Sequence, residues 1–118
     1  MVLIGGGVGA VTRFIVGTVI VAAIGARFPF GTIFINLSGS FLIGFAMTLL
    51  TERAHLSPNW RFLLVVGFLG GYTTFSSFEW ETLSLIRDGN RWLGFLNGFG
   101  SIILGYLAVW FGAFVAGR

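Results

Sequence analysis

Four long apolar stretches take up most of the chain, and each is long enough to cross a membrane as a helix. They run over residues 2–24, 31–51, 60–86 and 92–116. At a rise of about 1.5 Å per residue, each stretch reaches across the roughly 30 Å hydrocarbon core of a bilayer. Only short hydrophilic joints separate them. The sequence therefore predicts an all-α integral membrane protein, a single four-helix domain over residues 1–118.

The composition agrees with a membrane protein and argues against several functional classes. Hydrophobic residues make up 56% of the chain and charged residues 9%, whereas a soluble domain carries about 25% charged residues. The first stretch has no basic leader and the length of a full span, so we expect it to be retained rather than cleaved as a signal peptide. We find no nucleotide motif, metal-ligand cluster or nucleophile–base pair, and we expect neither an enzyme nor a nucleic-acid-binding protein. His55 is expected to have no role in function.

A run of glycine and hydroxyl residues interrupts the third apolar stretch. Residues 70–78 read Gly-Gly-Tyr-Thr-Thr-Phe-Ser-Ser-Phe. Irregular backbone at membrane depth survives only where it is buried in protein or lines a polar pathway, because lipid offers no hydrogen-bond partners. The run therefore predicts a third helix that is broken at mid-membrane beside an ion site. Carbonyls at such a break suit a monovalent cation, and free amides suit an anion.

Polar and aromatic side chains at helical spacing predict a route for an anion. Thr32, Asn36 and Ser40 follow one another every four residues and share a helix face. Their donors could replace the water around an anion, although Asn36 could equally form an interhelical hydrogen bond. Phe75 and Phe78 are three residues apart, and the positive edge of an aromatic ring can contact a small anion. The alternative for both rings is ordinary packing against lipid or core.

Arg13 and Glu81 are charged residues that lie well inside the apolar stretches. Arg13 lies near the middle of the first, where an arginine costs about 2.5–3.5 kcal/mol, so its side chain must face protein or water. Arg13 either attracts an anion into a vestibule or clamps helices by hydrogen bonds to carbonyls or a carboxylate. Glu81, four residues after Ser77 and on the same face, is the acidic residue expected to reach polar partners inside the bundle.

The remaining arginines are balanced between the two ends of the predicted bundle. One end receives Arg53, Arg61 and Arg118, and the other receives Arg27, Arg87 and Arg91. Since an excess of Lys and Arg at one end normally fixes orientation, this balance predicts insertion both ways round and an antiparallel dimer. Misplaced span boundaries that hide a bias are the alternative. Small residues every four positions, such as Gly5 and Gly9, predict close helix packing within one copy or between copies.

Three segments of the chain resemble the Fluc family of small fluoride channels. They are Gly-Ala-Val-Thr-Arg at 9–13, Gly-Thr at 31–32 with Asn-Leu-Ser-Gly at 36–39, and Gly-Phe-Leu-Gly-Gly-Tyr-Thr-Thr-Phe-Ser-Ser-Phe at 67–78 followed by Glu81. A glycine pair running into Thr-Thr-Phe-Ser-x-Phe is highly specific in so small a protein. The resemblance covers essentially the whole chain.

The resemblance implies an antiparallel, dual-topology homodimer with two anion pores in a prokaryotic plasma membrane. It implies passive export of fluoride, which relieves fluoride toxicity, and a central structural sodium ion that is not transported. By resemblance, the anion path comprises Asn36, Phe75, Phe78, Ser76, Ser77, Thr32, Glu81 and Ser101, Arg13 lies at its vestibule, and the backbone carbonyls of Gly70 and Thr73 hold the sodium ion.

The fourth stretch departs from the family pattern and leaves its pore ligands open. Asn97 stands where a tyrosine can occur, and Gly105 stands where a serine can occur. Two other interpretations remain. A small multidrug proton-coupled transporter also has four spans, but it needs a membrane-embedded carboxylate, and the first stretch offers Arg13 instead. The chain could also be a non-conducting subunit or one half of a heterodimeric fluoride channel.

Overall fold

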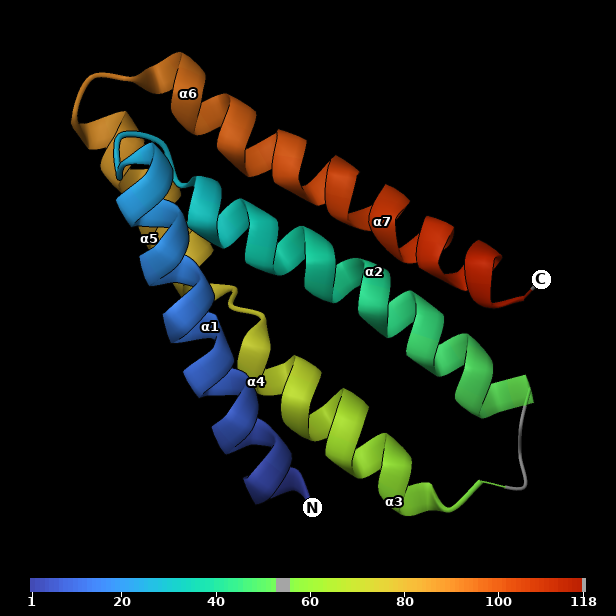
Figure 1. Ribbon diagram of the computed structural model, residues 1–118. Helices are drawn as coiled ribbons and strands as arrows, with labels where there is room; N and C mark the ends of the chain where they lie inside the picture. Colours follow the sequence, from blue (N-terminus) through green and yellow to red (C-terminus); the bar gives the residue numbers. More distant parts are fainter. Residues whose placement is uncertain (53–55, 118) are drawn as a thin grey trace.

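The computed structural model describes residues 1–52 and 56–117, and their regular structure is helical (Figure 1). The elements are α1 (Val2–Ile24), α2 (Phe30–Glu52), α3 (Pro58–Trp60), the π-helical η1 (Arg61–Leu69), α4 (Gly70–Tyr72), α5 (Ser76–Arg87), α6 (Arg91–Phe95), the π-helical η2 (Leu96–Gly100) and α7 (Ser101–Ala116). Four stretches are long and apolar enough to cross a membrane: Val2–Ile24, Phe30–Glu52, Pro58–Arg87 and Arg91–Ala116. The prediction of an all-α protein with four membrane-spanning helices is confirmed.

The third of these stretches is not one continuous helix. α3, η1 and α4 follow one another without a gap, and α4 ends at Tyr72. Thr73 then adopts an extended conformation, with ψ at 158°, and α5 begins at Ser76. Residues 73–75 lie outside the helices, and we call them the extended segment after Thr73, although the backbone of Phe75 has already returned to the right-handed helical region.

The helices pack as two close pairs. α1 lies against η1 and α4, while α2 runs beside α7, as Figure 1 shows. A Cβ atom on Gly9 would collide with the backbone of Phe68 and Tyr72, and one on Gly44 would collide with that of Val109. These glycines let the backbones approach within a single copy, which is one of the two uses expected for the small residues.

A small core lies beside the extended segment. Ile35, Leu69 and Tyr72 are buried there, with Val16 and Phe68 packed against them. Many other apolar side chains on these helices are exposed, which suits contact with lipid or with a second copy. Arg53, Arg118 and His55 lie outside the described residues, so the balance of arginines stays a prediction.

Candidate functional site

Asn36 binds the backbone of the extended segment through both atoms of its amide. Its Nδ2 donates to the carbonyl oxygen of Thr74 at 2.8 Å, and the Thr74 amide donates to its Oδ1 at 2.9 Å. The break in the helix leaves these two backbone groups without helical partners. Asn36 on α2 is therefore hydrogen-bonded to another span, as one alternative for it expected, but its partner is the non-helical segment, which these bonds stabilise.

Two backbone carbonyls lose their usual amide partners as a result. In a continuous helix the Thr74 amide would donate to Gly70 and the Ser77 amide to Thr73. Here the Thr74 amide donates to Asn36, and the Ser77 amide donates to Thr74 Oγ1 at 3.3 Å. Among the described residues no amide outside the helices donates to the oxygen of Gly70 or Thr73. Neutral carbonyl oxygens of this kind fit a monovalent metal cation such as sodium.

A cavity of about 320 Å³ opens beside this segment. Asn36, Gly70, Thr73 and Phe75 line it, together with Ser40 and Thr74 among others. The structure thus brings Asn36 and Phe75 together with Gly70 and Thr73, the two residues whose carbonyl oxygens are predicted to bind sodium.

Phe75 and Phe78 lie against each other but differ in environment. Their ring centroids are 5.9 Å apart, with 43° between the ring planes. Phe75, at the end of the extended segment, is 67% exposed, whereas Phe78 in α5 is only 8% exposed. A partner molecule or an ion can reach the Phe75 ring directly, while the Phe78 ring is held by packing.

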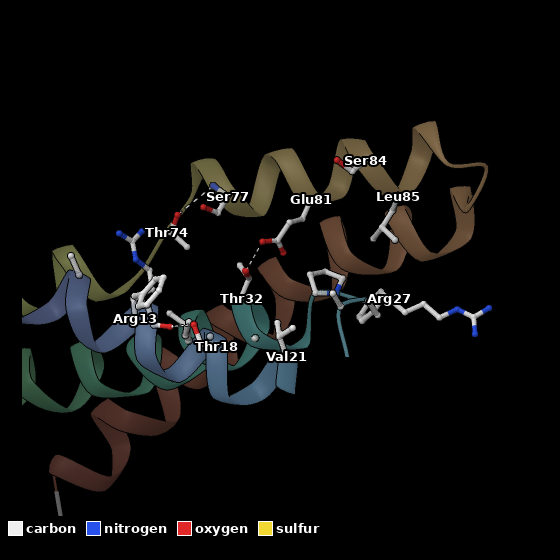
Figure 2. A pocket seen from close by; sticks show the side chains of 18 of the residues that line it. Arg13, Thr18, Val21, Arg27, Thr32, Thr74, Ser77, Glu81, Ser84 and Leu85 are labelled. Carbon is white, nitrogen blue, oxygen red and sulfur yellow. Dashed lines mark hydrogen bonds between the residues drawn. The ribbon is translucent and has the colours of Figure 1, made fainter. Parts of the chain in front are cut away.

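A larger cavity of about 750 Å³ lies between α1, α2 and α5 (Figure 2). Thr32 Oγ1 donates to Glu81 Oε1 at 2.7 Å across it. Oε2 of Glu81 is buried and has no hydrogen-bond partner within the described part of the chain. Arg13, Ser77 and Arg27 also line the cavity, and the end of the Arg27 side chain points outward. Among the described residues, Arg13 has no ion-pair partner.

The structure does not place Ser76 or Ser101 on either cavity. Ser76 is the exposed first residue of α5. Ser101 donates to Asn97 Oδ1 at 3.4 Å, and Asn97 Nδ2 donates to Thr82 Oγ1 at 2.8 Å. Ser76 and Ser101 therefore remain predicted members of the anion path. Within a single copy, the structure does not bring them to the other predicted members.

Comparison with known proteins identifies the family. Residues 1–113 match the family described as CrcB-like protein, Camphor Resistance (CrcB). The chain belongs to the CrcB family. A relative from Solibacter usitatus, named Fluoride-specific ion channel FluC, is 58% identical over 118 residues, which cover 100% of this chain and 97% of the relative.

More distant CrcB relatives carry the same name. One from Acidobacterium capsulatum is 47% identical over 117 residues, covering 99% of this chain and 94% of the relative. One from Pyrococcus horikoshii is 41% identical over 118 residues, covering 100% and 94%. The resemblance to fluoride channels expected from the sequence is therefore confirmed at the level of family.

The sequence did not single out Thr74 in this CrcB chain, although Thr74 is central to the site. It lines both cavities, its backbone pairs with Asn36, and its hydroxyl accepts the Ser77 amide. For its neighbour Thr73, the sequence analysis predicted a role only for the backbone carbonyl, as a sodium ligand. The signal that could have found Thr74 is its place directly before an aromatic residue and two serines, where a hydroxyl residue caps the helix that follows.

Proposed function

We propose that this chain is the subunit of a fluoride-specific ion channel, and not of an enzyme. The observation that carries the proposal is the full-length, 58% identity to a protein of that name, within a family that matches residues 1–113. Four helices able to span a membrane, with two cavities that polar side chains help to line, are consistent with a multi-pass membrane channel. We place it in a prokaryotic plasma membrane.

In this proposal fluoride enters the larger cavity beside Arg13. The positive charge of Arg13 raises the local concentration of anions. The anion then passes the hydroxyls of Thr32 and Ser77 beside Glu81, with Ser76 and Ser101 as further polar contacts. Hydroxyl donors replace part of the water that the ion gives up.

The narrow part of the path lies at the extended segment. An amide nitrogen carries two hydrogens, and Asn36 uses one of them on Thr74, so the other remains for the anion. The edges of the Phe75 and Phe78 rings supply the positive part of their quadrupoles. The amide and the ring edges carry only partial charges, so they bind the anion weakly enough for it to leave quickly.

The functional channel is proposed to be an antiparallel homodimer with a structural sodium ion. Support comes from the balanced arginines of the sequence and from the released carbonyls of Gly70 and Thr73. These two oxygens from each copy would hold sodium, whose charge offsets the repulsion between carbonyl dipoles. The sodium ion takes no part in transport.

Passive conduction is enough to clear fluoride from a cell. Hydrogen fluoride crosses membranes as a neutral acid and dissociates in the cytoplasm, where the anion is trapped. An inside-negative potential drives anions outward by about 2.3 kcal/mol per charge for each 100 mV. No fuel or coupled ion is therefore needed.

The test uses liposomes that contain only the purified protein. Fluoride efflux is followed with an electrode after a potassium ionophore balances the charge, with chloride efflux and protein-free liposomes as controls. Rapid fluoride release without chloride release is the expected result. Proton-driven uptake of a cationic dye without fluoride release would favour the multidrug transporter. Release that appears only after a second homologue is added would favour a heterodimer.

A further inference from the structure

Asn97 is the most deeply buried polar side chain in the described part of the chain. It lies in the π-helical segment η2 of the fourth span and is only 2% exposed. Its Nδ2 donates to Thr82 Oγ1 at 2.8 Å, and its Oδ1 accepts from Ser101 at 3.4 Å. The proposed anion path gives Asn97 no role.

Thr82 connects Asn97 to residues of the proposed path. A hydroxyl can accept and donate at once. Thr82 Oγ1 accepts from Asn97 and donates to the carbonyl oxygen of Phe78 at 2.8 Å. Thr82 also follows Glu81 directly in α5. A rotation of α5 that broke the bond to Asn97 would therefore move both Phe78 and Glu81.

The rotation of α5 has to be set by contacts of this kind. Residues 73–75 are not helical, so no continuous helix transmits the orientation of α4 to α5. Side-chain hydrogen bonds tie α5 to neighbouring helices on two sides: Glu81 accepts from Thr32 of α2, and Thr82 accepts from Asn97 of η2. Close packing brings the second pair into range, because a Cβ atom on Gly94 would meet the side chain of Ile86.

We propose that Asn97 is a positioning residue for the anion path. Its hydrogen bond to Thr82 fixes the rotation of α5 and so holds the Phe78 ring and the Glu81 carboxylate in place. Asn97 does not itself touch the ion. The proposal rests on the proposed fluoride conduction, and its test includes a measurement that does not depend on conduction.

The test removes either side of the bond. Asn97→Leu keeps the approximate size without the amide, Thr82→Val keeps the shape without the hydroxyl, and the double variant removes both. Fluoride efflux is measured per folded dimer, and ¹⁹F NMR follows 4-fluorophenylalanine introduced at Phe78. Tyr72→Phe, which removes the 2.8 Å hydrogen bond between Tyr72 and Ser38, is the control for losing one interhelical bond elsewhere.

We expect each single variant to lower efflux by about tenfold, as displaced positioning groups do. The double variant should be no more than about twofold worse than either single one, because all three lack the same bond. The ¹⁹F resonance at position 78 should shift or broaden in all three and stay unchanged in Tyr72→Phe. Thr82→Ser, which keeps the hydroxyl, should restore both efflux and resonance.

Three outcomes would overturn the proposal: wild-type efflux in both single variants, losses that multiply in the double variant, or an unchanged ¹⁹F resonance. If Asn97→Leu yields no folded protein, Thr82→Val decides, since it only exchanges a hydroxyl for a methyl group. Absence of efflux from the wild-type protein would instead refute the proposed function, and the NMR comparison would still show whether Asn97 positions Phe78.

Discussion

At the scale of single residues, Asn36 shows where sequence reasoning stops. A lone amide within an apolar stretch had to face protein, and its spacing from Thr32 indicated which face. Its partner is the backbone of Thr74, 38 residues away in the chain, and that pairing exists only because the helix is interrupted there. Composition and periodicity carry no information about which backbone groups become free.

Phe75 and Phe78 should separate conduction from stability when each is changed to isoleucine. Losing a ring-edge contact of about 1.4 kcal/mol would slow fluoride efflux about tenfold in either variant. Phe78 is buried, so Phe78→Ile should also lower the free energy of unfolding by about 1 kcal/mol, whereas Phe75→Ile should change it by less than about 0.5 kcal/mol. Liposome efflux and thermal unfolding in detergent provide the two readouts. Wild-type efflux in both variants would rule out the ring-edge contact.

Arg13 should act through its charge alone. Arg13→Gln is expected to reduce fluoride efflux about tenfold at low ionic strength, with a smaller effect above roughly 0.15 M salt, because screening weakens steering. Arg13→Lys is the matched control and should behave like the wild type, since no ion pair of Arg13 with a described residue fixes a guanidinium geometry. Equal losses in the two variants would indicate a helix clamp instead.

At the scale of elements, the glycine pair of the third span and the interruption are separate features. Gly70 and Gly71 were expected at the break, but both are helical and belong to α4. Gly71 instead permits close contact with Gly6 of α1. The non-helical residues follow at 73–75, where hydroxyl side chains bond to nearby backbone. The π-helical segments η1 and η2 were not predicted, because their hydrogen-bond pattern has no signature in residue spacing.

Close contact between α1 and the third span gives a prediction for two neighbouring glycines. Gly9→Ala should destabilise the protein by about 1–3 kcal/mol, because its Cβ would overlap the backbone of Phe68 and Tyr72. Gly7→Ala is the control on the same helix: nothing lies within 4 Å of its Cβ position, and alanine favours a helix by up to about 1 kcal/mol. Thermal unfolding in detergent compares them. Equal stability of the two variants would contradict the packing of α1 described above.

At the scale of the whole molecule, the four spans could be predicted because hydrophobic length alone specifies them. Their observed bounds differ from the predicted ones by at most two residues. The proposed dimer could not be derived so directly, since it would depend on surfaces that only a second copy completes. Phe75, with 67% of its surface exposed beside the smaller cavity, is a surface that the proposal leaves for such a copy.

Dual topology can be measured because the chain contains no cysteine. Asn90→Cys introduces one thiol in the turn between α5 and α6. We expect about half of the copies in intact cells to react with a membrane-impermeant maleimide, because the arginines give no preferred orientation. Full labelling after the cells are opened is the control. Labelling of all copies or of none before opening would indicate a single orientation.

Thr74 borders both cavities, so the two hollows approach each other at this residue. Where water reaches deep into a membrane protein from two sides, most of the transmembrane voltage falls across the thin barrier that remains. An ion crossing beside Thr74 would then experience most of the electrical driving force within a few ångströms. The rate of the channel should accordingly depend on voltage chiefly through that one step.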